Sequence, residues 1–478
     1  MHTRRRIPAV AVLVAATVLT LAGSWIPSYW NDEAATLRLA RLPLDDLLAF
    51  AQQKDAVHLV YGLLMHGWIA VAGESEIAVR APSALAVGAA TAGVLVLLRE
   101  LDRPRAAVLA SVVFVALPRS SFNGTEARSY AVTTALVVWA AVLIVRAARD
   151  GGARRWSAFV LVAGAANAVF LYSVLVLPVF VFLAAVVAPQ RGRTVVAAVL
   201  AAALSVLAAT PVIVLAAGQS AQIGWLRSQP VNAYTVVVES FFGSAWWLAV
   251  LAVGVIVVAL ARGRSQGERQ PSPRPLAPVI ALWLVLPAAV LLLGSLLVEP
   301  MFTPRYLSMS SPAVAIALGL ALASWRPAIS AVLVGLIVVA ALPSLVSMRT
   351  ETGKPAGQDL RALAQGIRDR ARPGDAVLLG DTGTASLRPR VALAAYPAAF
   401  DALHDVALAS AYAPTGTYSD VLLEGGALRS ALEGEGRVWV AVPDSDSASF
   451  DWLDEIGFER REGFDVPAIS VTLWERRA

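Results

Sequence analysis

Long apolar runs alternate with short polar loops along the first three quarters of the chain. Most runs are about 16 to 24 residues long, the length that an α-helix needs to cross the hydrocarbon core of a bilayer. They lie at 7–26, 77–98, 106–117, 130–145, 157–187, 194–217, 244–260, 277–298, 306–324 and 328–346. The run at 157–187 has room for two short spans and the run at 106–117 is short. The pattern therefore predicts about eleven transmembrane helices, within one or two.

The pattern changes after Met348. From 349 to 478 the chain is charged and is interrupted by Gly and Pro. The segment DLRALAQGIRDRA has the periodicity of a helix, whereas PGDAVLLGD and GRVWVAVP contain the short apolar runs of buried strands. We predict an α-helical polytopic membrane domain at 1–348 and a soluble α/β domain at 349–478, which is long enough for a core of its own. The polar stretch GRSQGERQPSPRP is expected to be a linker.

Arginines occur in every second loop, as in the cytoplasmic loops of membrane proteins. With Arg4 to Arg6 taken as cytoplasmic, the basic loops hold Arg99, Arg103 and Arg105; Arg146, Arg149, Arg154 and Arg155; Arg191 and Arg193; Arg262, Arg264, Arg269 and Arg274; and Arg326. The intervening loops hold Asp32, Glu33, Glu126, Glu239 and Glu299. This alternation predicts a multi-pass plasma-membrane protein with a cytoplasmic N-terminus. An odd number of spans places the α/β domain outside the cytoplasm.

Composition agrees with a membrane protein, because 58% of the residues are hydrophobic and 15% are charged. The net charge of +5 follows from the basic cytoplasmic loops and suits anionic lipid headgroups, so no nucleic-acid partner is predicted. The chain has no Cys, which excludes disulfides and thiolate metal sites. No convincing A-x-A cleavage site precedes WNDEA, so the first apolar run is expected to be retained as a span.

The acidic pair Asp32 and Glu33 lies directly after the first apolar run. Carboxylates are costly beside hydrocarbon and persist there where water, a partner or chemistry is available. A pair at the outer mouth of a helical bundle is well placed to deprotonate an acceptor, although a hydrated acidic loop is the alternative. The pair also offers hard oxygen ligands to Mg²⁺ or Mn²⁺. No further clear ligands are evident in the sequence, so a divalent ion bridged by the pair is kept as the minor alternative.

A second polar patch on the outer side is KDAVHLVYGLLMHGW. His58 and Tyr61 are three residues apart and Met65 follows at helical spacing, so they can share one face of a short interfacial helix. His58 and Tyr61 are candidate substrate-binding residues. The alternative is that both anchor the helix in the headgroup layer.

Two further patches carry arginines on the outer side, against the charge bias. In NGTEARSYA, Glu126 and Tyr130 are candidate substrate-binding residues and Arg128 is a candidate phosphate-binding residue, because a guanidinium binds phosphate with two hydrogen bonds. In VEPMFTPRYLSMSSP, Arg305 and Tyr306 are candidates for the same phosphate. The alternatives are a helix-capping role for Glu126, lipid headgroup contact for Arg305 and an aromatic-belt position for Tyr306.

Taken in order, WNDEA, the His58 to Tyr61 segment, EARSY and PRYLSMSSP resemble the GT-C superfamily of membrane glycosyltransferases. The branch is the one with the protein O-mannosyltransferases and the lipid A aminoarabinose transferase, and the resemblance covers roughly residues 1–345. It implies a polyprenyl phosphate sugar as donor, Asp32 as catalytic base with Glu33 beside it, and Arg128 or Arg305 on the donor phosphate. The chain departs from relatives at DAVHLVY, where they often have His followed by Pro and Leu.

The expected activity is transfer of a sugar, with mannose favoured, to an extracytoplasmic envelope glycan, glycolipid or protein. The α/β tail differs from the β-trefoil domain of eukaryotic O-mannosyltransferases, so the resemblance does not favour a protein acceptor. One base and no covalent nucleophile predict inversion at the anomeric carbon. Two other functional classes remain open: a transporter or lipid flippase, and a membrane scaffold that binds an envelope polymer.

Overall fold

A computed structural model describes residues 7–265, 276–382, 385–412, 420–446 and 449–478. The predicted cytoplasmic segment Arg4 to Arg6 lies outside the described residues, as does most of the predicted linker. The chain forms two compact units. The first comprises Met1–Ala22, Asp55–Tyr61 and Arg80–Val346, and the second comprises Gly23–Lys54, Gly62–Val79 and Ser347–Ala478. The second unit thus joins the predicted α/β tail to two segments from early in the chain.

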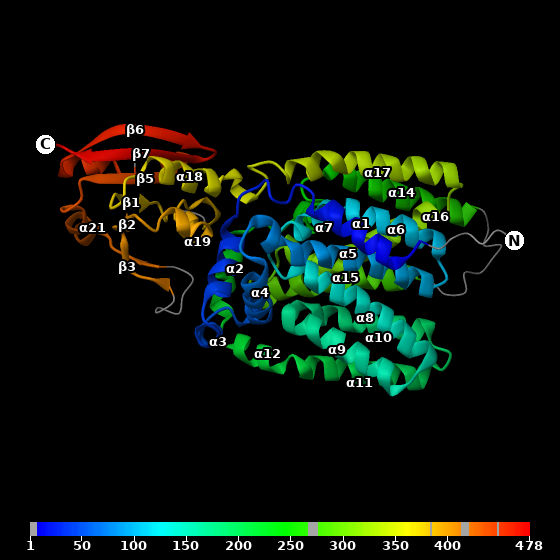
Figure 1. Cartoon of the computed structure of the whole chain (residues 1–478). Helices are drawn as coiled ribbons and strands as arrows, with labels where there is room; N and C mark the ends of the chain where they lie inside the picture. Colours follow the sequence, from blue (N-terminus) through cyan, green and yellow to red (C-terminus); the bar gives the residue numbers. More distant parts are fainter. Residues whose placement is uncertain (1–6, 266–275, 383–384, 413–419, 447–448) are drawn as a thin grey trace. The chain divides into compact units, whose positions relative to one another are not determined.

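The first unit is helical, and Figure 1 shows its long helices lying roughly alongside one another. Its α-helices are α1 (Ala9–Leu21), α5 (Glu76–Glu100), α6 (Pro104–Ala116), α7 (Pro118–Gly124), α8 (Tyr130–Asp150), α9 (Ala153–Val169), α10 (Leu177–Val187), α11 (Arg191–Ala208), α12 (Thr210–Ala217), α13 (Ser240–Phe242), α14 (Trp246–Ser265), α15 (Ala277–Leu297), α16 (Ser311–Ala323) and α17 (Pro327–Ser347). Shorter helical turns are η1 (Ala56–His58), η2 (Leu171–Val176), η3 (Ser220–Ser228), η4 (Tyr234–Glu239) and η5 (Pro304–Ser310).

Six of the described helical segments are long and apolar enough to cross a membrane, or eight if each of two bent pairs is one span. Three shorter apolar helices lie at Ala9–Leu21, Ala56–Ala72 and Leu171–Val187. The prediction of a polytopic helical protein is confirmed, whereas the count of eleven spans is not.

The two irregular apolar runs have local explanations. The run at 106–117 ends in a 64° bend between α6 and α7, because Leu117 is extended before Pro118 and a residue before proline avoids the helical region. The run at 157–187 breaks at Phe170, which is extended between α9 and η2. It therefore forms two helices, as its length suggested.

Small residues bring the helices of the first unit close together. Gly319 in α16 lies against α6, and a Cβ atom at this position would stand 2.6 Å from the Ala110 side chain and 2.8 Å from the Ala106 carbonyl oxygen. Such close backbone approach increases van der Waals contact where apolar lipid provides little driving force for helix association. The α6–α16 contact therefore depends on the absence of a side chain at 319.

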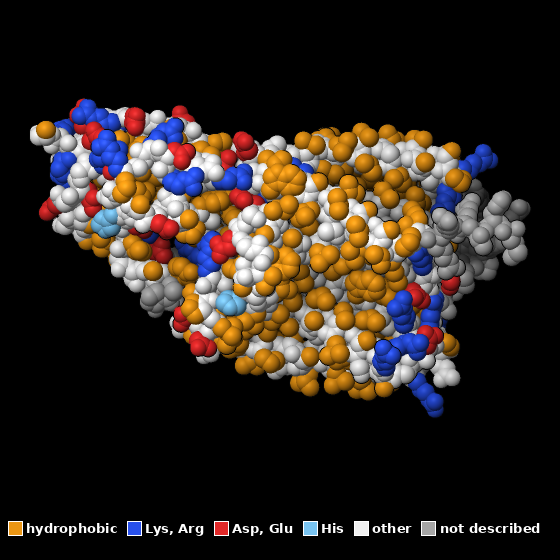
Figure 2. All heavy atoms as spheres, viewed as in Figure 1, with side chains coloured by type: hydrophobic (Ala, Val, Ile, Leu, Met, Phe, Trp, Pro, Cys, Tyr) orange, Lys and Arg blue, Asp and Glu red, His pale blue; other side chains and the backbone are white. Residues whose placement is uncertain are grey.

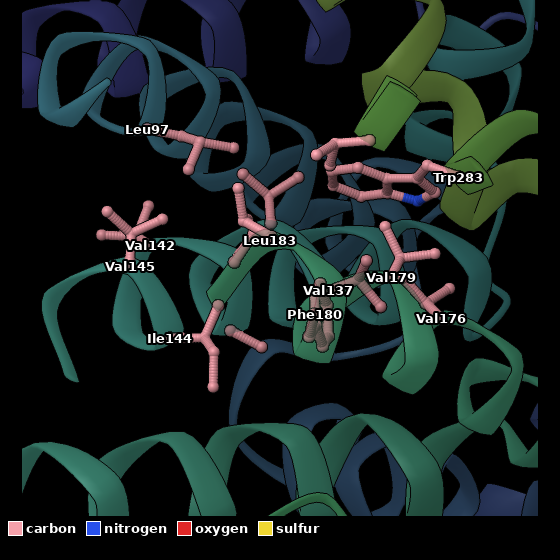
Figure 3. Close-up of a cluster of buried hydrophobic side chains, with 14 of the residues drawn as sticks. Leu97, Val137, Val142, Ile144, Val145, Val176, Val179, Phe180, Leu183 and Trp283 are labelled. Carbon is pink, nitrogen blue, oxygen red and sulfur yellow. The ribbon is translucent and has the colours of Figure 1, made fainter. Parts of the chain in front are cut away.

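The largest apolar cluster fills the space between α5, α8, α10 and α15, and Figure 3 shows Phe180 and Trp283 among its members. The two rings meet edge to face with centroids 6.2 Å apart. The Trp283 indole N–H donates to the Met309 carbonyl at 3.1 Å, and the Ser310 hydroxyl donates to the Trp283 carbonyl at 3.0 Å. These bonds satisfy polar groups that would otherwise be costly inside the cluster.

The second unit contains a five-stranded mixed sheet with strand order β2-β1-β5-β7-β6. Its strands are β1 (Ala376–Leu379), β2 (His404–Asp405), β5 (Arg437–Pro443), β6 (Phe458–Val466) and β7 (Ile469–Arg476), and β3 (Leu408–Ser410) pairs separately with β4 (Val421–Leu422). β1 is parallel to β2 and β5, while β7 is antiparallel to β5 and β6. Edge strand β6 carries the charged sequence FERREG, which discourages further strand pairing.

Helices complete the second unit. They are α2 (Asn31–Arg41), α3 (Leu44–Gln53), α18 (Leu360–Arg370), α19 (Val391–Ala395) and α21 (Gly425–Leu432), while α4 (Leu59–Ala72) has most of its residues here. The remaining short turns are η6 (Pro355–Gly357), η7 (Ala385–Leu387), η8 (Pro397–Ala399), η9 (Asp444–Asp446) and η10 (Asp451–Ile456). The predicted helix and the two predicted strands correspond to α18, β1 and β5, so the sequence pattern of the tail is confirmed.

The surface of the helical unit is apolar on the face shown in Figure 2, and Lys and Arg side chains gather at one end of that unit. On α11, for example, Val196, Leu200 and Leu204 are exposed. An apolar surface of this extent on a helical bundle is suited to contact with lipid.

We predict that Gly319→Ala destabilises the protein by about 1–3 kcal/mol, because the new methyl group overpacks the α6–α16 contact. Gly335→Ala is the matched control, since no atom lies within 4 Å of a Cβ at this helical glycine. Thermal unfolding in detergent should show a lower midpoint for Gly319→Ala alone. Equal midpoints for the two variants would contradict the proposed close contact.

Candidate functional site

The acidic pair lies in the first turn of α2. Trp30 is extended at the N-cap position, and Asp32 and Glu33 follow where the helix dipole favours negative charge. Asp32 is half-buried, the Asn31 amide nitrogen approaches its carboxylate at 3.5 Å, and the Thr36 hydroxyl donates to its carbonyl at 3.2 Å. Asp32 therefore lies in a helical turn, with part of the residue exposed to solvent.

Glu33 has a different environment from its neighbour. Its side chain is 0% exposed, and Lys354 Nζ lies 3.7 Å from its Oε2. Lys354 is itself almost fully buried. A buried carboxylate paired with a buried ammonium is held in one place, so Glu33 is better suited to fix the first turn of α2 than to meet a substrate.

The tail of the second unit also holds the segments around α2. The Tyr396 hydroxyl accepts from the Tyr29 backbone N–H at 2.9 Å and donates to Glu76 Oε1 at 2.8 Å. Arg41 forms two hydrogen bonds to Glu74 Oε2, at 3.0 and 2.7 Å. Burial, and secondly the Glu76 carboxylate, raise the pKa of the Tyr396 hydroxyl, so Tyr396 remains a proton donor.

The remaining predicted site residues lie in the first unit. Arg128 donates to His58 Nε2 at 2.9 Å. Because a guanidinium has no acceptor, this bond requires a neutral His58 ring with its proton on Nδ1. Asp55, with φ of 61°, turns the chain into η1, and the Ala56 N–H donates to the Gln219 side chain at 2.9 Å. In this arrangement His58 orients Arg128.

Tyr130 and Tyr306 belong to one aromatic cluster. The ring centroid of Tyr306 is 6.4 Å from that of Tyr130, 5.5 Å from that of Phe170 and 5.1 Å from that of Tyr172. The Tyr306 hydroxyl also lies in the electrostatic field of Arg305 and Arg128. EARSY and PRYLSMSSP, distant in sequence, are therefore brought together.

Arg305 stacks over the Trp225 ring, with its guanidinium carbon 5.2 Å from the ring centroid. Stacking on an aromatic face favours a guanidinium plane that lies parallel to the ring. Glu126 is 1% exposed at the turn between α7 and α8. Tyr61 is also buried, near the start of α4.

Arg119 in α7 is not among the residues predicted from the sequence. Its guanidinium donates to the Glu239 carbonyl and interacts electrostatically with Glu126, Arg305 and Tyr130. Its position in the sequence could have identified it as a candidate, because Arg119 follows the run at 106–117 in the same loop as Arg128. Like Arg128, it is an arginine on the predicted outer side, where the charge bias does not favour arginine. Arg80, fully buried near the start of α5, was missed as well.

The first unit thus brings together His58, Glu126, Arg128, Tyr130, Arg305 and Tyr306, and adds Arg119. Arginine and tyrosine donors in this number suit an anion with several oxygens, such as a phosphate. Asp32 and Glu33 belong to the second unit. Among the residues that the structure describes, no group of three or more His, Cys, Asp or Glu side chains is arranged to hold a metal ion.

No family model matches the sequence, and no curated protein matches it. The fold is similar to that of ArnT from Cupriavidus metallidurans, in the apo state and bound to undecaprenyl phosphate; each structure gives a TM-score of 0.60 at 12% identity, covering 97% of both chains. The archaeal oligosaccharyltransferase AglB from Archaeoglobus fulgidus, in complex with an inhibitory peptide and a dolichol-phosphate, gives 0.48 at 12% identity, covering 94% of this chain and 70% of that one.

The similarity to ArnT shows that the two proteins share a fold. The resemblance predicted from the order of four short motifs is therefore confirmed for the fold. At 12% identity it does not assign a role to any residue of this chain.

We predict that Tyr396→Phe lowers the free energy of unfolding by about 1–3 kcal/mol, since it removes the partner of the Tyr29 N–H and of Glu76. Tyr234→Phe, at an exposed position, is the control. The pKa of Tyr396 is raised above its ordinary value of 10.0, so ionisation favours the unfolded chain at higher pH. Denaturant unfolding should show the difference between wild type and Tyr396→Phe shrinking above pH 10.0. A constant difference would contradict this assignment.

Proposed function

We propose that the protein is a membrane glycosyltransferase that moves a sugar from a polyprenyl phosphate donor to an acceptor outside the cytoplasm. The observation that carries the proposal is the group of arginines and tyrosines in the first unit, on a fold shared with ArnT. The solved ArnT structure is bound to undecaprenyl phosphate. Mannose is the sugar that the motif resemblance favours.

The donor phosphate would be bound by Arg128, Arg305 and Tyr306. Arg128 is oriented by His58, and Arg305 is oriented by Trp225. A polyprenyl phosphate gains negative charge as its bond to the sugar breaks, and preorganised guanidinium groups stabilise that charge most strongly at the transition state. Arg119 would add a third positive charge, balanced in part by Glu126.

An apolar groove in the first unit suits the lipid part of such a donor. It measures about 640 Å³, lies between α10 and α11, and is lined by Val, Leu, Pro, Phe and Ala side chains. Val174 at this groove is two residues from Tyr172, whose ring contacts Tyr306. The phosphate of one donor molecule could therefore bind at the polar cluster while its polyprenyl chain lies in the groove.

Asp32 would act as the base. Its carboxylate accepts the proton of the acceptor hydroxyl, the hydroxyl oxygen bonds to the anomeric carbon, and the carbon–oxygen bond to phosphate breaks, with both electrons leaving on polyprenyl phosphate. A single displacement inverts the anomeric configuration. The half-buried position of Asp32 supports this assignment, whereas the buried Glu33 would support Asp32 without accepting the proton itself.

The alternation of basic and acidic loops supports a cytoplasmic N-terminus and an extracytoplasmic second unit in the plasma membrane. Donor and acceptor would then meet on the side that soluble nucleotide sugars do not reach. This orientation favours an envelope glycan or glycolipid as acceptor.

We predict that Asp32→Asn reduces sugar transfer by about 10²–10⁴-fold, because the amide cannot accept the proton. Asp46→Asn, at an exposed aspartate in the first turn of α3, should retain wild-type transfer. The measurement is transfer of radiolabelled sugar from polyprenyl phosphate mannose, and then from other polyprenyl phosphate sugars, into membranes that contain each variant. Wild-type transfer by Asp32→Asn would exclude Asp32 as the base, and a glycosyl adduct on Asp32 or Glu33 would exclude single displacement. Absence of transfer by the wild type from every donor would favour a transporter or scaffold.

We predict that Arg128→Gln and Arg305→Gln each weaken donor binding by about 10- to 100-fold, since each removes charge-assisted hydrogen bonds to phosphate. Arg326→Gln, at an exposed arginine between α16 and α17, is the control. The dissociation constant of the sugar-free polyprenyl phosphate should rise for the first two variants alone. If all three proteins bind this lipid equally, the phosphate site lies elsewhere.

A further inference from the structure

Residues that follow the last helix of the first unit run alongside the segment that leads into α2. The Ser28 hydroxyl accepts from the Leu360 N–H at 3.1 Å and lies 3.4 Å from the Gln358 carbonyl. Arg361 donates to the Trp25 carbonyl at 3.0 Å and also to that of Ile26. The entry to α2 is therefore tied to the start of the tail by backbone and side-chain hydrogen bonds within the second unit.

Lys354 belongs to this part of the tail and reaches Glu33. The exposed fractions of the two side chains are 2% and 0%, and the ion pair measures 3.7 Å. Removing either charge alone would take this ion-pair partner away from the other buried group, which is unfavourable. The pair therefore holds the side of the first turn of α2 that faces away from solvent.

The backbone around Lys354 keeps its position well defined. Ala356 and Gly357 follow in the left-handed region, with φ of 72° and 66°, and reverse the chain before α18. Asp359 then caps α18 by accepting from the Ala362 N–H at 3.0 Å. The Lys354 side chain is 2% exposed, so the packing around it restricts its ammonium group to a position beside Glu33.

We propose that Lys354 is a positioning residue for the transfer reaction: through its ion pair with Glu33 it fixes the turn that carries Asp32. The inference rests on the proposed function, because it assigns Asp32 the role of base. Glu33 and Asp32 are adjacent in the first turn of α2, so a displacement of one peptide unit moves both side chains. A carboxylate that must meet a hydroxyl within hydrogen-bond distance loses much of its effect when it moves by about 1 Å.

The inference predicts that Lys354→Met lowers kcat by about 10-fold or more, while KM for the donor changes little, because the donor phosphate is bound by other residues. In an Asp32→Asn background the same substitution should cause no further loss, since its effect passes through Asp32. Arg437→Met is the matched control. It removes the cation that pairs with the buried Asp375 in the sheet, at 3.0 Å, and should lower stability with an unchanged kcat.

Amide hydrogen exchange tests whether Lys354 fixes the first turn of α2, and this measurement does not require sugar transfer. Amides of residues 31–36 should exchange faster in Lys354→Met than in the wild type, and should be unchanged in Arg437→Met. If Lys354→Met does not fold, Glu33→Gln/Lys354→Met avoids the unpaired buried charge and should show the same faster exchange and reduced kcat.

The outcomes separate this inference from the proposed function. Wild-type exchange and wild-type kcat in the Lys354 variants would overturn the positioning role and leave the glycosyltransferase proposal intact. The positioning role would also be overturned if Lys354→Met lowered kcat by the same factor in the wild type and in the Asp32→Asn background. If the wild type transfers no sugar, the proposed function fails, and hydrogen exchange alone still decides whether Lys354 fixes the turn.

Discussion

The free energy of removing a charge from water determines where the ionisable side chains of this protein lie. In the helical unit, Arg146 of α8 pairs at 2.8 Å with Glu100, the last residue of α5, and both side chains remain partly exposed. In the second unit, Arg390 is 3% exposed and is bound by Asp405 at 2.6 Å and Asp420 at 2.9 Å. Because a buried charge is tolerated where an opposite charge and hydrogen bonds replace its water, each such group fixes the position of its neighbours.

The same constraint gives the two candidate polar regions different characters. In the first unit, Arg119, Arg128 and Arg305 contact a backbone carbonyl, a histidine and an indole ring, respectively, and Glu126 and Glu239 lie near Arg119. Three arginines in one cluster can bind an anion that has several oxygens. Around Asp32 and Glu33 the charges are closer to balance, since Lys354 accompanies the pair. Glu33 is the buried member of the acidic pair, whereas Asp32 is half-buried.

Much of the fold was predictable because hydrophobicity and periodicity are local properties. The positions of α18, β1 and β5 followed from short patterns in the tail, and the apolar runs gave six long helices of the first unit. The number of spans was not predictable in this way, since a break such as that at Phe170 or a bend such as that at Pro118 depends on one residue within a continuous apolar run. The length of an apolar run limits how long a helix can be, but packing decides whether the run forms one continuous span or two helices.

The sequence by itself determined that the chain is a helical membrane protein with an α/β tail, and it identified Arg128, Arg305 and Tyr306 as unusual polar residues beside apolar runs. Tertiary structure alone decided that Arg128 and Arg305 share the surroundings of Tyr306, that Arg119 joins them, and that Glu33 is buried against Lys354. The physical reason is that propensity, hydropathy and charge bias act over one or two helical turns. Ion pairs and aromatic contacts between residues hundreds of positions apart exist once the helices have packed.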